Sequence, residues 1–236
     1  MLKFIKEYWD SFLYLFYPDL CIICNNNDRE VHDTFCFDCY AQLPFTYQGT
    51  ALNNDFMQHF AGKINIQHGA SLFYFIKQGM VQGIIQDLKY RNKPQYGIKM
   101  GEIFGASIKE DSFFKNIDAI VPIPLYKSKE IQRGYNQSSK FAEGISKVLS
   151  IPIISNNLIR IRHTNTQTKM TREERLVNLK NAFTVKNSQL FEEKHILLVD
   201  DVLTTGTTLL ECGKKILECK DSKISMATIA MGELLR

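Results

Sequence analysis

The chain has 236 residues, of which 44% are hydrophobic and 23% are charged. This is the composition of an ordinary globular protein rather than a disordered or fibrous one, and the length suits one full domain with a small appendage. The formal net charge of +4 permits contact with phosphate-bearing ligands or nucleic acid without requiring it.

The first twenty residues are rich in aromatic side chains, which raises the question of a membrane segment. Charged residues interrupt the stretch at Lys3, Lys6, Glu7 and Asp10. No run of about 20 apolar residues remains for a membrane span, and a signal peptide's uninterrupted apolar core is missing. Apolar residues recur at helical spacing at Phe4, Ile5, Tyr8, Trp9, Phe12 and Phe16. We expect an amphipathic helix packed on a cytoplasmic protein, without stable membrane insertion; an interfacial membrane helix is the less favoured alternative.

Four of the six cysteines form two CxxC pairs, Cys21 with Cys24 and Cys36 with Cys39. Two such pairs supply the four thiolates of a tetrahedral structural Zn²⁺ site. We therefore expect a zinc-binding domain over residues 1–50, with His32 and His59 as alternative ligands and paired disulfides as the alternative chemistry. Cys212 and Cys219 are expected to be ordinary residues of a later helix and its continuation.

Residues 40–70 carry weak signals and are treated as a boundary zone before a second domain over 65–236. A strand is expected over 70–76 and a helix over 79–88. The basic turn that follows, residues 89–94, is read equally well as a solvated helix end or as an anion contact.

The next predicted elements are a helix over 97–108 and a buried strand over 117–125, which must stop at its prolines. A loop over 126–138 follows, and a helix is expected over 138–149. Because loops at the carboxyl ends of parallel strands build the site in open α/β sheets, Lys127, Lys129 and Arg133 are expected to face one pocket.

Residues 151–158 are predicted to form a third strand, and residues 182–185 another short one. Between them, residues 160–178 are polar and basic, and Thr171 with Glu174 is typical of a helix-starting capping box. A stretch with so few apolar residues is poorly held by core packing, so we interpret it as a lid rich in phosphate-binding cations.

The most informative stretch runs from residue 193 to residue 210. The apolar run 196–199 predicts a buried parallel strand, which ends in Asp200 and Asp201. The sequence Thr204-Thr205-Gly206-Thr207-Thr208 comes next and opens a predicted helix over 209–217. Free N–H groups and the helix dipole make such a turn an anion site. Two acids beside a phosphate fit a phosphorylated ribose bound with Mg²⁺.

The turn has no lysine after its glycine and only one glycine, which excludes a Walker A loop and a dinucleotide fingerprint. A last strand is predicted over 224–230. The repeated order of strand and helix predicts an α/β fold with a mainly parallel sheet, helices on both faces and right-handed crossovers.

Six motifs in this order resemble the ComF family, which includes ComFC- and GntX-type proteins. They are the paired CxxC, Leu88-Lys89-Tyr90, Val121-Pro122-Ile123-Pro124-Leu125, Arg133-Gly134-Tyr135-Asn136-Gln137, residues 167–175 with Asn178, and residues 199–208. The last of these resembles the phosphoribosyl pyrophosphate (PRPP) motif of type I phosphoribosyltransferases. The resemblance covers nearly the whole chain and implies a type I phosphoribosyltransferase-like fold with an N-terminal zinc knuckle.

The resemblance also implies roles for individual residues. Asp200 and Asp201 would hold the ribose hydroxyls, and Thr204, Thr205, Gly206, Thr207 and Thr208 would bind the 5′-phosphate. The pyrophosphate loop would include Arg133, Gly134, Asn136 and Gln137. Lid and accessory positions would be Lys89, Gln167, Arg172 and Arg175. Mg²⁺ would be held largely through substrate oxygens.

Three functions follow as hypotheses. The first is phosphoribosyl transfer from PRPP to an acceptor that the sequence does not identify, with release of pyrophosphate, in a protein of natural transformation and DNA uptake. The second is a non-catalytic module that binds single-stranded DNA, alongside DNA-uptake proteins. The third is a PRPP-sensing regulator that uses the pocket as a switch.

Overall fold

The computed structural model describes residues 9, 12, 20–26, 34–46, 54–161 and 181–232. These fall into two compact units, Met1–Leu43 and Pro44–Arg236. Among the described residues, no helix is long and apolar enough to cross a bilayer.

The first unit contains four of the six cysteines, and its described residues include the short helix α2 (Phe37–Gln42). Of the aromatic residues in the predicted N-terminal helix, the structure describes Trp9 and Phe12; the others lie outside the described residues. Both rings are more than half exposed, and they meet edge to face with centroids 5.7 Å apart. Cys21, Cys36 and Cys39 are buried around the half-buried Ile23, and this cluster of described residues is made largely of thiols.

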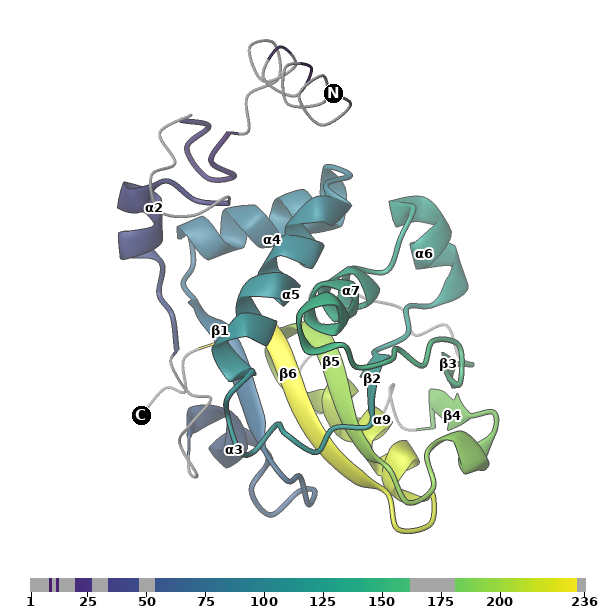
Figure 1. The fold of residues 1–236 in the computed structure, drawn as a ribbon. Helices are drawn as coiled ribbons and strands as arrows, with labels where there is room; N and C mark the ends of the chain where they lie inside the picture. Colours follow the sequence, from purple (N-terminus) through teal and green to yellow (C-terminus); the bar gives the residue numbers. More distant parts are fainter. Residues whose placement is uncertain are drawn as a thin grey trace. The chain divides into compact units, whose positions relative to one another are not determined.

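A four-stranded parallel sheet forms the centre of the second unit, in the order β1-β6-β5-β2 (Figure 1). Its strands are β1 (Gly69–Phe75), β2 (Ala119–Pro122), β5 (His195–Leu203) and β6 (Lys223–Gly232). The central strand β5 is fully buried from Ile196 to Val199, as the continuous apolar run predicts. The mainly parallel α/β sheet expected from the sequence is confirmed.

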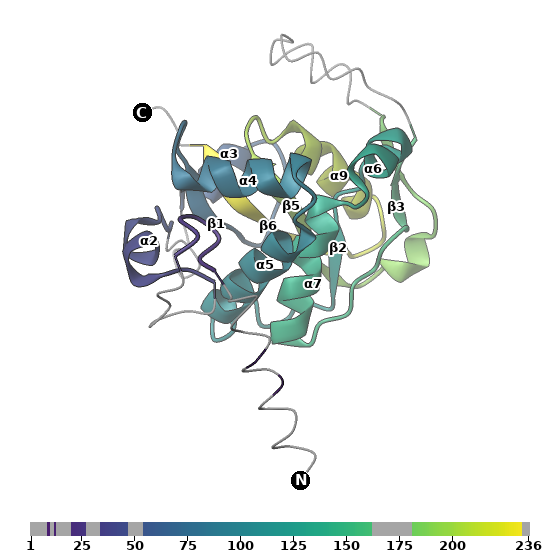
Figure 2. The same cartoon turned by 90° about the horizontal axis from the view of Figure 1, so that it is seen from above.

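Helices cover both faces of this sheet. In Figure 1, α5 (Pro94–Ile108) and α7 (Gln137–Leu149) lie in front of it, and α9 (Thr207–Leu217) lies behind. Helix α4 (Met80–Tyr90) lies near the carboxyl ends of the strands, and its last turn is beside α6 (Lys127–Arg133), which Figure 2 shows from above. The carboxyl edge of the sheet is therefore framed by the ends of α4, α6, α7 and α9.

Three sequence expectations need correction. The predicted strand over 151–158 is not a strand, because Pro152 lacks an N–H and Asn156 turns the chain at φ 63°. Only Ile153 bridges Ile120, and the next strand is β3 (Leu158–Arg160). It pairs antiparallel with β4 (Phe183–Val185) in a separate two-stranded sheet. Residues 162–180, which include most of the predicted lid, lie between these strands and outside the described residues.

The second correction concerns the predicted loop over 126–138, where residues 127–133 form helix α6. The third concerns the boundary zone, which contains helix α3 (Asp55–Phe60). A one-turn 3-10 helix lies later in the chain, at Ser188–Leu190. Asn54 caps α3 by accepting a hydrogen bond from Met57 N at 2.8 Å. Phe56 and Phe60 are buried in the main core, so this segment belongs to the second unit.

Candidate functional site

The two acids at the carboxyl end of β5 are each held by a different neighbour. The apolar strand continues to Leu203, so Asp200 and Asp201 lie within it rather than after it. Ser138 Oγ, at the start of α7, donates to Asp200 Oδ1 at 2.9 Å. Lys89 Nζ, in the last turn of α4, lies 2.9 Å from Asp201 Oδ2. Three elements distant in sequence thus converge on the acid pair.

Asp200 has an unusual protonation equilibrium for a carboxyl group. Burial, and after it the charge of Asp201, raise its pKa to about 7, although hydrogen bonds from Asp201 N and Ser138 oppose the shift. Both burial and a neighbouring like charge penalise the ionised form. Near neutral pH this side chain therefore exchanges between a neutral acid and a carboxylate.

The threonine turn, residues 204–208, connects β5 to α9. Gly206 adopts φ 71° and forms the N-cap of α9, in the left-handed region that favours glycine. The hydroxyls of Thr205 and Thr207 are 3.0 Å apart. The first N–H groups of a helix have no intrahelical partner, so this turn presents donors and the positive end of an eleven-residue helix. It can bind an anion such as a phosphate.

His59, expected only as an alternative zinc ligand, lies against this turn. A Cβ added at Gly206 would lie 2.7 Å from His59 Nε2, so the imidazole fills the space beside the glycine. His59 belongs to α3 of the second unit, whereas the four clustered cysteines belong to the first. His32, the other alternative ligand, lies outside the described residues.

The predicted pyrophosphate loop divides into supporting and exposed residues. Asn136 is buried; its Nδ2 donates to Ile123 O and its Oδ1 accepts from Ser138 N, which caps α7. Gln137 is also buried, and its Oε1 accepts from Arg133 Nη1 at 2.8 Å. Gly134 ends α6 at φ 80°. The buried side chains of Asn136 and Gln137 therefore fix the conformation of this turn, and Arg133 is its half-exposed cation.

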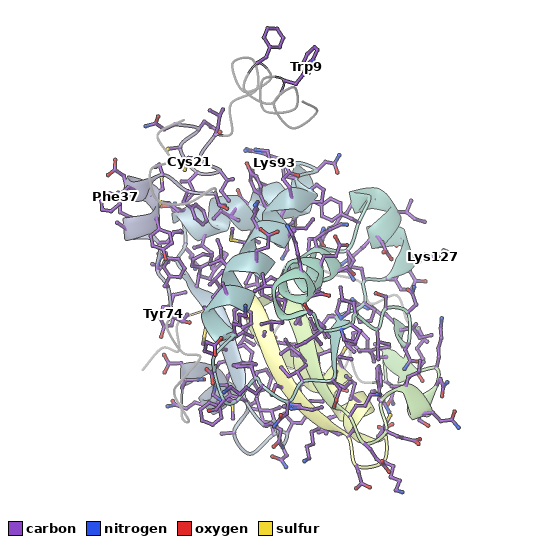
Figure 3. The ribbon with its side chains drawn as sticks, viewed as in Figure 1. Trp9, Cys21, Phe37, Tyr74, Lys93 and Lys127 are labelled. Carbon is purple, nitrogen blue, oxygen red and sulfur yellow. The ribbon has the colours of Figure 1, made fainter. Side chains whose placement is uncertain are left out.

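Arg133 lines a cavity of about 480 Å³ between the end of α4 and α6, which we term the cationic pocket. Its lining residues are Lys89, Tyr90, Asn92, Lys129, Ile131, Gln132, Arg133 and Gly134. Burial lowers the pKa of Lys129, and the positive charges of Arg160, Arg133 and Lys89 lower it further. Lys127 is exposed at the outer side of α6 (Figure 3) and does not line the cavity.

In the basic turn over 89–94 the Arg91 side chain is 71% exposed, as expected for a solvated helix end, and the anion contact stays a prediction. Lys89 reaches Asp201, whereas Arg91 and Lys93 each bond Asp87 within α4 at 3.0 Å. No local pattern predicts the contact of Ser138 with Asp200, or that of Tyr135, whose hydroxyl donates to Leu88 O at 2.5 Å next to Lys89. The lid residues Gln167, Arg172 and Arg175 lie outside the described residues.

The four cysteine sulfurs of the first unit form one cluster. The Sγ atoms of Cys21, Cys24, Cys36 and Cys39 all lie within 4.8 Å of one another. Those of Cys24 and Cys36 are 3.6 Å apart, close to the separation of about 3.8 Å that a tetrahedral Zn–S distance of about 2.3 Å requires. The amide N–H of Asn26 points at Cys24 Sγ at 3.4 Å, as around a bound thiolate. These residues fit a metal ion.

Comparison with known proteins agrees with this geometry. A phosphoribosyl transferase domain model matches residues 135–233, which include Ser138, the acid pair and the threonine turn. Competence protein F of Haemophilus influenzae is 30% identical over 208 residues, which are 84% of this chain and 91% of that protein. Competence protein ComFC of Bacillus subtilis is 36% identical over 42% of this chain and 38% of its own length.

More distant similarities exist among solved structures. A glutamine PRPP amidotransferase from B. subtilis aligns with 15% identity and a TM-score of 0.41 over 61% of this chain and 30% of that one. A purine phosphoribosyltransferase from Pyrococcus horikoshii aligns with 16% identity and a TM-score of 0.38 over 58% and 75%. From the extent of the match to competence protein F, the chain belongs to the ComF family of competence proteins, with a phosphoribosyltransferase-type domain as its main unit.

Proposed function

We propose that this protein binds PRPP together with Mg²⁺ and transfers its phosphoribosyl group to an acceptor, releasing pyrophosphate. One observation supports the proposal above the others. The acid pair, Asp200 and Asp201, lies near the carboxyl end of β5, two residues before the threonine turn that opens α9. Carboxylates suit the hydroxyls of a ribose and the turn suits its 5′-phosphate, so the two ends of one sugar phosphate are both accommodated.

In this proposal the 5′-phosphate lies at residues 204–208, held by the N–H groups that open α9 and by the threonine hydroxyls. Asp200 and Asp201 accept hydrogen bonds from the 2′- and 3′-hydroxyls. Lys89, Lys129 and Arg133 stabilise the pyrophosphate as its bond to C1 breaks and negative charge develops on it. The acid pair in turn offsets the positive charge that develops on the ribose.

The oxygen donors of the acid pair fit Mg²⁺, which prefers carboxylates combined with substrate phosphates. When bound, Mg²⁺ would neutralise pyrophosphate oxygens. Lys89 Nζ lies between Asp201 and the cationic pocket, and arriving phosphates would compete for it. Gln167, Arg172 and Arg175 would belong to a lid over residues 164–175 that keeps water from trapping the activated ribose.

We further propose that the four cysteines bind a structural Zn²⁺ and that the protein acts in the cytoplasm, in natural transformation and DNA uptake. Reduced thiols coordinated to a metal are typical of that compartment. A second candidate function, binding of single-stranded DNA or sensing of PRPP without catalysis, is favoured by one observation: Tyr90 is 74% exposed beside the cationic pocket. Bases stack on such aromatic side chains.

Calorimetric titration of PRPP into the purified protein, with and without Mg²⁺, tests the proposal. We expect saturable binding to one site that weakens when Mg²⁺ is chelated, and pyrophosphate should compete for it. Binding of DNA with a steep salt dependence that Asp200→Asn leaves unchanged would instead support the DNA-binding module. Pyrophosphate release in the presence of candidate acceptors separates an enzyme from a sensor.

The raised pKa of Asp200 predicts that PRPP binding strengthens as the pH rises. The carboxylate, which grips hydroxyls and cations, is the minor form below a pKa of about 7 and the major form above it. The affinity for PRPP with Mg²⁺ should therefore increase several-fold between pH 6 and pH 8, and calorimetry at intermediate values should locate the midpoint. Asp200→Asn should abolish this dependence; an unchanged slope in that variant would assign it to the ligand's own phosphates.

A further inference from the structure

The cationic pocket is larger than the pyrophosphate end of PRPP requires. Its volume of about 480 Å³ lies within the range of about 300–1,000 Å³ that holds drug-sized organic ligands. Lys89, Lys129 and Arg133 line it, and none of its described lining residues is acidic. It opens between the last turn of α4 and α6, which adjoin in both views of the fold (Figures 1 and 2). The pocket therefore suits an organic anion with clustered charges.

Two large apolar side chains border the same pocket and are open to solvent. Tyr90 is 74% exposed and Ile131 is 73% exposed, the highest values among the exposed large hydrophobics of the described residues. Neither helps to hold the fold at that level of exposure, so their placement beside the cations is better explained by a ligand.

The tyrosine is held in a defined setting. The Arg133 guanidinium carbon lies 5.6 Å from the centroid of the Tyr90 ring, within the range of a cation–π contact. Arg133 is in turn bonded to the buried Gln137. Lys129 lies on the preceding turn of α6, close enough to Arg133 for the positive charge of Arg133 to lower the pKa of Lys129. A stacking surface and a group of cations are thus fixed side by side.

We infer that the cationic pocket binds a nucleoside polyphosphate, with the base on Tyr90 and Ile131 and the phosphates on Lys129, Arg133 and Lys89. This binding goes beyond PRPP transfer and does not depend on it. Its consequence does rest on the proposed function, because a nucleotide there would occupy the place proposed for pyrophosphate and would compete with PRPP.

A single nucleotide fits these observations better than a DNA strand does. Proteins that hold single strands combine a groove of cations that tracks the backbone with a series of aromatic side chains. Here the cations converge on one pocket, and Tyr90 is the one aromatic residue among its described lining residues. The arrangement matches one base with its phosphates gathered together.

Titrations of ADP, pyrophosphate and adenosine into the full chain test the inference. We expect ADP to bind about tenfold more tightly than pyrophosphate, since stacking of one base contributes about 1–3 kcal/mol, or roughly 5- to 150-fold. Tyr90→Ala should remove this advantage and leave pyrophosphate binding unchanged, whereas Tyr90→Phe should keep it. Lys129→Gln should weaken both ligands by about tenfold. Lys127→Gln, an exposed cation on the same helix, is the matched control and should alter neither.

Several outcomes would overturn the inference. The first is that ADP binds no more tightly than pyrophosphate, and the second is that Tyr90→Ala weakens the affinity for both ligands equally. The third is that a short oligothymidylate binds more tightly than ADP with the same dependence on Tyr90. The double change Asp200→Asn with Asp201→Asn separates this site from the proposed function. It should abolish PRPP binding and leave ADP binding within about threefold of the unaltered protein. Loss of ADP binding in that variant would overturn the inference, because it would show that ADP binds through the acid pair in the PRPP site.

Discussion

Changing both acids together, Asp200→Asn with Asp201→Asn, should weaken the binding of PRPP with Mg²⁺ by at least about 100-fold. Each aspartate carries a charge-assisted hydrogen bond to a ribose hydroxyl or a contact to the cation in the proposed complex, and each is worth about 1.5–3 kcal/mol. Two such losses, at about 1.4 kcal/mol for each factor of ten, give this magnitude. Calorimetric titration in the presence of Mg²⁺ measures the change directly.

The same variant should remain folded. Burial and the neighbouring charge of Asp201 disfavour the ionised form of Asp200, so an amide at position 200 removes an unfavourable charge. Because its folded pKa lies above the usual value, the carboxyl destabilises the fold progressively from about pH 4 to about pH 7, and Asp200→Asn should raise the free energy of unfolding at pH 8.

Asp221→Asn is the matched control for this change. Asp221 is exposed and lies two residues before β6, at the opposite end of the sheet from the acid pair. It should leave both stability and PRPP binding unchanged. Full PRPP affinity in the double variant would contradict the assignment of the acid pair, whereas a loss of affinity in Asp221→Asn would show that the assay reports general charge.

Removing the metal should unfold the first unit. Among the described residues of this unit, few apolar side chains other than the cysteines, Phe35 and Leu43 are buried, so Zn²⁺ binding, about 10–16 kcal/mol in zinc-finger peptides, should supply much of its folding energy. The purified protein should contain one zinc per chain by elemental analysis. A strong chelator should release it and make the first unit sensitive to protease, while the second unit, which has its own core, resists.

Single changes at the cluster sharpen this test. Cys36→Ser should reduce the zinc content to well below one per chain, because a hydroxyl is a poor replacement for a thiolate at a four-sulfur site. Cys219→Ser alters a buried cysteine of the second unit and is the control, so it should retain one zinc. Disulfides between the four cysteines, detected by mass spectrometry under non-reducing conditions, would contradict the metal assignment.

The parts of the site that the sequence predicts are those defined by local pattern. The apolar run before Asp200 and Asp201 can only be a buried strand in a chain of this length, and a threonine turn with one glycine can open a helix. Both are found in β5 and α9. The CxxC pairs are equally local, because their spacing alone brings four thiols together.

Features that depend on tertiary contacts could not be predicted in this way. Helix α6 has no buried residue, so it shows no apolar periodicity and its sequence reads as a loop. Ser138, His59 and Tyr135 reach the site only through folding, and each is an ordinary polar or aromatic residue in its own segment. The strand expected over 151–158 had a suitable composition, but Pro152 and Asn156 limit its pairing to the single bridge between Ile153 and Ile120.

A crystal structure of the protein with PRPP and Mg²⁺ tests the central assignment most directly. We predict density for the 5′-phosphate at the N–H groups of residues 204–208, and the ribose hydroxyls within hydrogen-bond distance of Asp200 and Asp201. Density for the sugar phosphate elsewhere, with the acid pair still bonded to Ser138 and Lys89 and the threonine turn without a ligand at saturating PRPP, would contradict it.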